Sequence, residues 1–138
     1  MPLTFSIDAA RGIVHLVFTG NPTFDEWAQV MTEVLEHPDF RPGIGVISDR
    51  RGIPVPSADY VRSAIEFSHA HPALSSCLYA LIVSDTASYG MARMGQILGD
   101  DLRAPIGIFR TPEEAEDWIV AHNRPRRVIA DTADFTRR

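Results

Sequence analysis

The sequence contains no lysine, one cysteine and no long apolar run. The lone Cys77 excludes an internal disulfide framework and fits a reducing compartment. No apolar run approaches the ~18 residues that a membrane-spanning helix needs. The N-terminus also lacks a basic segment followed by an apolar one, which a secretory signal would show. We therefore expect a cytoplasmic protein with no transmembrane segment.

Motifs of common enzyme classes are also missing. The chain has no G-x-S-x-G, G-x-G-x-x-G or G-x-x-x-x-G-K-[ST] segment. His69 and His71 are two residues apart on a predicted helix, so they do not share a face. No cysteine or acidic cluster accompanies them. We expect no catalytic activity, no cofactor and no metal site.

Composition and charge indicate a folded acidic body with a basic end. The 138 residues are 45% hydrophobic and 22% charged, with a net charge of −5, which is typical of one globular domain. Residues 1–123 carry 8 Arg against 16 acidic residues, and residues 124–138 carry 5 Arg against 2 Asp. The acidic body argues against nucleic-acid binding, because phosphate binding needs a basic face.

Apolar segments of strand length recur along the chain. Leu3, Phe5 and Ile7 alternate with polar residues, which predicts a strand with one buried face, and Gly12 suits the hairpin loop that follows. Nearly continuous apolar runs, which are typical of strands covered on both faces, follow at residues 13–18, 44–47, 78–83 and 106–109.

Amphipathic segments with capping signals separate these runs. Thr23 and Glu26 form a capping box, Ser57 can cap a second helix, a third lies near residues 87–98, and Thr111-Pro112 begins a fourth. The order β-β-α-β-α-β-α-β-α predicts a mixed, mostly parallel five-stranded sheet, its first strand antiparallel, flanked by four main helices. We assign residues 1–122 to this single α/β domain.

The basic tail, residues 123–138, carries the apolar residues Val128, Ile129 and Phe135. Its charge is opposite to that of the body, so attraction favours docking. We expect the tail to pack on the domain or on a partner subunit, and a homodimer is the favoured setting.

Several segments together resemble a known family. The segments "FTGNPTFDEW", "ISDRRG" and "IFRTPEEAEDWI", with the hairpin start, are similar to the SpoIIAA-like family of the STAS superfamily of anti-sigma-factor antagonist domains, over residues 3–122. The resemblance implies a mixed sheet and no general catalytic activity. Related folds act as phosphorylation-controlled protein-binding modules or as parts of lipid-carrier domains.

The resemblance also bears on phosphorylation. Antagonist proteins carry a phosphorylatable serine in the loop after the third strand, at a helix start. Asp49 matches an acidic position of that pattern, but Arg50 and Arg51 replace the serine region. Ser57 is a candidate by proximity, and a simple N-cap is its alternative role.

Polar residues follow each parallel strand, where ligands bind in open parallel sheets. The candidate ligand-binding residues are Asp49, Arg50, Arg51, Ser84, Asp85, Arg110 and Thr111. The alternative is that Asp49 and Asp85 cap helices or pair with the arginines.

The resemblance and the missing motifs favour a non-catalytic regulatory or protein-interaction module. The alternative is a binding protein for a small anionic or lipid-like, amphipathic ligand. The ligand would lie at the edge where the parallel strands end, or under the helix that carries Tyr89, Met91 and Met94. A deep apolar pocket with convergent polar groups would favour this second function, and a flat edge the first. An enzyme is the third hypothesis.

Overall fold

A computed structural model, which describes residues 2–123, contains a five-stranded sheet in the order β1-β2-β3-β4-β5. The strands are β1 (Leu3–Asp8), β2 (Ile13–Phe18), β3 (Gly45–Asp49), β4 (Leu78–Ile82) and β5 (Ile106–Phe109). β1 pairs antiparallel with β2, and the other neighbouring strands pair in parallel. The predicted mixed α/β sheet is confirmed.

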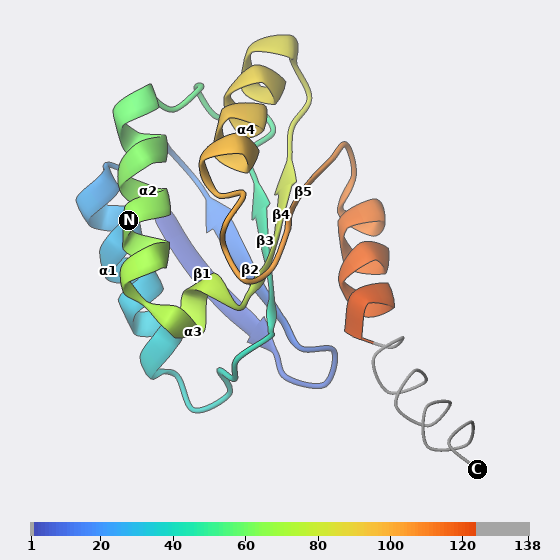
Figure 1. Ribbon diagram of the computed structural model, residues 1–138. Helices are drawn as coiled ribbons and strands as arrows, with labels where there is room; N and C mark the ends of the chain where they lie inside the picture. The colour runs from blue at the N-terminus through green and yellow to red at the C-terminus, as the bar shows by residue number, and fades with distance from the viewer. Residues whose placement is uncertain (1, 124–138) are drawn as a thin grey trace.

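The four main helices predicted from the sequence are present. They are α1 (Phe24–Glu36), α2 (Ala58–Ala70), α4 (Thr86–Leu98) and a C-terminal helix over residues 112–123. A short helix, α3 (Pro72–Ser75), was not predicted. Figure 1 shows α1, α2 and α4 on one side of the sheet and the C-terminal helix on the other. No helix in the described part of the chain is long and apolar enough to cross a membrane.

Local hydrogen bonds explain where α1 begins. The Thr23 hydroxyl accepts from the backbone N–H of Glu26 at 3.1 Å. The Glu26 carboxylate accepts in return from the backbone N–H of Thr23 at 2.8 Å. Each contact satisfies a donor that the first helical turn would otherwise leave unpaired. The capping box expected from the sequence is therefore confirmed.

The C-terminal helix packs closely on the far face of the sheet. Ile119 and Ala115 are fully buried against Ile13, Ile47 and neighbouring strand residues. A Cβ atom on Gly45 would lie 2.5 Å from Cγ2 of Ile119, a distance that real contacts exclude. The missing side chain at Gly45 thus lets this helix sit close to the sheet.

The prediction that the basic tail docks, with Val128, Ile129 and Phe135 buried, falls on residues 124–138. These residues lie outside the part of the chain that the structure describes. The docking of the tail therefore stays a prediction.

Candidate ligand-binding site

A cavity of about 120 Å³ lies between the sheet and helices α2 and α4. Most of its wall is apolar. The main lining residues are Tyr60, Val61, Ala64 and Ile65 from α2, Ser88, Met91, Ala92 and Gly95 from α4, and Ser48, Tyr79, Leu81 and Ile106 from the sheet. An apolar cavity of roughly 150 Å³ binds benzene, so this space suits an apolar group of about six carbons.

The cavity is elongated and has two different ends. Alternate residues of one chain segment, from Cys77 to Val83, line it, and a strand rises about 3.3 Å per residue, so the wall runs the length of β4. The end near the start of β4 is apolar and includes Leu74 and Ala104. The end near the strand carboxyl termini holds polar groups, and Arg50 is the charged one among the described lining residues.

Arg50 is buried at this polar end, with 9% of its surface exposed. Its Nη2 donates to Oδ1 of Asn21 at 3.2 Å and to the Pro54 carbonyl at 3.0 Å. Its guanidinium lies 4.9 Å from the ring centroid of Phe18 and 5.9 Å from that of Tyr60. Burial lowers the pKa of Arg50, but an arginine stays charged in proteins.

Three hydroxyl groups also lie along this part of the cavity, on Tyr60, Ser48 and Ser88, and the Ser88 hydroxyl donates to the Asp85 carboxylate. The Tyr60 hydroxyl is buried beside the Arg50 guanidinium and has no other hydrogen-bond partner among the described residues. Burial raises the pKa of Tyr60 to about 12, against the opposing effect of the nearby Arg50 charge. Ser48 is buried in β3 and lines the same cavity. The polar end therefore presents a cation and neutral hydroxyl groups.

Cys77 is buried at the apolar end of the cavity and is not activated. Its thiol lies 3.4 Å from the Ala73 carbonyl, to which it donates a weak hydrogen bond. Burial raises the pKa of Cys77 to about 12, so the thiol stays protonated at neutral pH.

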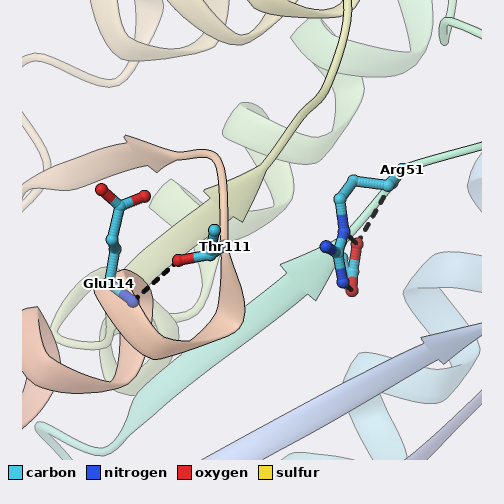
Figure 2. Close-up of polar contacts among 4 residues, drawn as sticks. Arg51, Thr111 and Glu114 are labelled. Atoms are coloured by element: carbon cyan, nitrogen blue, oxygen red, sulfur yellow. Dashed lines mark hydrogen bonds and ion pairs between the residues drawn. The ribbon is translucent and has the colours of Figure 1, made fainter.

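Strand alternation separates Arg50 from its sequence neighbours. Successive side chains of a strand point to opposite faces, and the Arg50 backbone N–H continues the β3–β4 ladder by donating to the Ile82 carbonyl at 3.0 Å. Asp49 and Arg51 form an ion pair away from the cavity, with contacts of 2.7 and 2.9 Å. The Arg51 hydrogen bond lowers the pKa of Asp49. Figure 2 shows this pair and the neighbouring start of the C-terminal helix.

Most of the other candidate residues form hydrogen bonds to backbone N–H groups at helix starts. The Asp85 carboxylate accepts from the N–H and hydroxyl of Ser88, at 2.8 and 3.0 Å, and so caps α4. The Thr111 hydroxyl accepts from the Glu114 N–H (Figure 2), and the Ser57 hydroxyl accepts from the Tyr60 N–H. Ser84 and Arg110 are exposed. Of the candidate set, Arg50 is the residue that lines the cavity.

Sequence reasoning did not include Phe18, Ser48 and Tyr60 in the site. A signal for Ser48 was present, because it is a hydroxyl in an apolar strand and shares its face with Arg50 two residues later. Tyr60 and Phe18 lie in segments that are far apart in the sequence. Only the packing of α2 on the sheet brings their rings to Arg50.

The paired histidines have structural contacts. His69 Nε2 lies 3.1 Å from the Asp101 carboxylate, which joins α2 to the loop after α4. His71 Nδ1 lies 2.8 Å from the Phe67 carbonyl. Within residues 2–123, no group of three or more His, Cys, Asp or Glu side chains is placed to hold a metal ion.

Comparison with known proteins found no match to any family model, curated protein or solved structure. The resemblance to the SpoIIAA-like family therefore stays a sequence-based prediction.

Proposed function

We propose that this protein is a non-catalytic binding module that holds a small, mainly apolar ligand between the sheet and helices α2 and α4. The cavity itself carries the proposal, since a deep apolar pocket with a few polar groups is the usual form of a small-molecule site. The state of the lining groups supports a binding role without catalysis. The Cys77 thiol and the Tyr60 hydroxyl, both with a pKa of about 12, stay protonated at neutral pH.

The size of the cavity sets the expected affinity. Burying about six CH₂ groups contributes roughly 5 kcal/mol, from about 0.8 kcal/mol each. Part of this gain is offset by the lost freedom of the ligand. We therefore expect a neutral six-carbon probe, 1-hexanol, to bind with a Kd on the order of 1 mM.

The two tryptophans provide a direct test. Trp27 lines the cavity. Trp118 belongs to the C-terminal helix and packs on the far face of the sheet. In a Trp118→Phe variant, the fluorescence of Trp27 should change saturably as 1-hexanol is added. In the matched Trp27→Phe variant, the fluorescence of Trp118 should stay constant over the same range. Equal responses of the two variants, or no response of Trp27, would contradict the proposal.

A regulatory protein-interaction module of the SpoIIAA-like, STAS type, active in the cytoplasm as a homodimer, is the second candidate. The outer face of β1 and β2 supports it, because Val17 is 46% exposed there, next to the exposed Thr4. β1 also lies at the edge of the sheet, and an exposed strand edge is a surface on which a strand of another chain can pair. Light scattering over a range of protein concentrations measures the oligomeric state directly.

A further inference from the structure

We propose that the ligand is a small monocarboxylate, whose anionic group pairs with Arg50 and whose tail of about six carbons fills the apolar part of the cavity. This inference rests on the proposed function and adds the chemical class of the ligand.

Arg50 is a buried cation without a counter-ion among the described residues. Arg50 is 9% exposed, and no described Asp or Glu forms an ion pair with it. Its described hydrogen-bond partners, the Asn21 amide oxygen, the Pro54 carbonyl and the Tyr60 hydroxyl, are neutral. Buried charges are normally paired, because removing a charge from water is costly. An anionic ligand in the adjoining cavity would supply the missing partner.

The geometry of the Arg50 guanidinium leaves N–H donors for a ligand. Arginine carries five N–H donors. The hydrogen bonds to Asn21 and Pro54 both use Nη2, and Tyr60 is the other described partner. These contacts and the Phe18 ring hold the group in place. Nε and Nη1 keep donors for a ligand, and two parallel N–H groups match the two oxygens of a carboxylate.

The lining of the cavity limits the charge of the ligand. Arg50 is the one charged side chain among the described residues that line the cavity, and the polar groups beside it, Ser48 and Tyr60, are neutral hydroxyls. A dianion such as a phosphate monoester would bring a second, unpaired charge into an apolar space. A ligand with one negative charge neutralises the single positive charge of Arg50.

The position of Arg50 relative to the apolar wall of the cavity suits a linear ligand. Arg50 lies at the end of the cavity near the strand carboxyl termini, and Leu74, Cys77 and Ala104 line the opposite end. A linear tail can therefore extend along β4 while its carboxylate stays at Arg50. The first turns of α2 and α4 begin at the same edge, where helix dipoles favour negative charge.

The test compares three ligands that each contain a linear chain of six carbons in total. In the full-length protein, titrated by Trp27 fluorescence and by calorimetry at neutral pH, hexanoate should bind about 10- to 100-fold more tightly than 1-hexanol, because hydrogen bonds to charged groups are the stronger ones. Hexyl phosphate should bind more weakly than hexanoate.

Variants then assign the preference to Arg50. Arg50→Met keeps a long apolar side chain over Phe18, and it should remove the preference for hexanoate while 1-hexanol still binds. Arg50→Lys should retain part of it, since lysine keeps the charge but loses the planar fork. The matched control is Arg51→Gln, because Arg51 pairs with Asp49 away from the cavity, and this variant should bind hexanoate within about twofold of the wild type.

The outcomes separate the two proposals. If 1-hexanol binds and hexanoate binds no more tightly, or if hexyl phosphate is preferred, the carboxylate inference is overturned and the binding function stands. If Trp27 responds to none of the three ligands, the binding function fails as well. If Arg50→Met does not fold, the ligand comparison on the wild type still decides.

Discussion

Replacing Ala92 with phenylalanine should abolish ligand binding and leave the protein folded. Ala92 is buried on α4 and lines the cavity, so its Cβ is placed to carry a larger group into that space. The added phenyl group has the size of benzene, which an apolar cavity of roughly 150 Å³ accommodates. We expect the affinity for hexanoate to fall more than about 100-fold. Overpacking should limit the loss of stability to about 1–3 kcal/mol.

The control for this variant lies on the same helix. Ala87 is exposed on the first turn of α4, so Ala87→Phe adds the same ring outside the cavity. This variant should bind hexanoate with wild-type affinity by calorimetry. If Ala92→Phe also bound hexanoate as the wild type does, the ligand would lie elsewhere.

Replacing Ile119 with alanine should lower the free energy of unfolding by about 2–5 kcal/mol, as for other fully buried large-to-small changes. Ile119 is 0% exposed. It packs directly on Gly45, where no side chain can move into the vacated space. Urea denaturation of both proteins measures the difference.

Asp117 provides the matched control on the same helix, since it is exposed. Asp117→Ala should change stability by no more than about 0.5 kcal/mol. A loss below about 1 kcal/mol for Ile119→Ala would show that the C-terminal helix does not hold this face of the sheet. Because the cavity lies on the other face, folded Ile119→Ala protein should keep its affinity for hexanoate.

The sequence predicted the strands and long helices because their signals are local. Alternation in β1 and the Thr23–Glu26 capping box are each set within a few residues. The four-residue α3 was missed, because it is too short to show an apolar period. Its start at Pro72 is explained by the fixed backbone angle of proline, which suits a first helical position.

The candidate site could be predicted only in part. The strand-end rule placed Arg50 at the edge where the polar end of the cavity lies, since parallel strands end together. The rule did not distinguish Arg50 from Arg51. Because side chains alternate along a strand, the Arg51 side chain lies on the opposite face from Arg50, away from the cavity. No local sequence pattern predicts the cavity. Its volume depends on how α2 packs beside α4, where Val61 approaches Gly95, and sequence spacing does not set that distance.

The central claim is tested most directly by intermolecular nuclear Overhauser effects between hexanoate and the wild-type protein. Met91 lines the cavity, whereas Met31 on α1 is fully buried in the core and serves as the control. We predict contacts from the hexanoate chain to the Met91 methyl group and none to Met31. The C2 protons should contact the Phe18 ring, and the terminal methyl group should contact Ala104. Absence of any contact to Met91, or a chain bound with its methyl end at Phe18, would contradict the account.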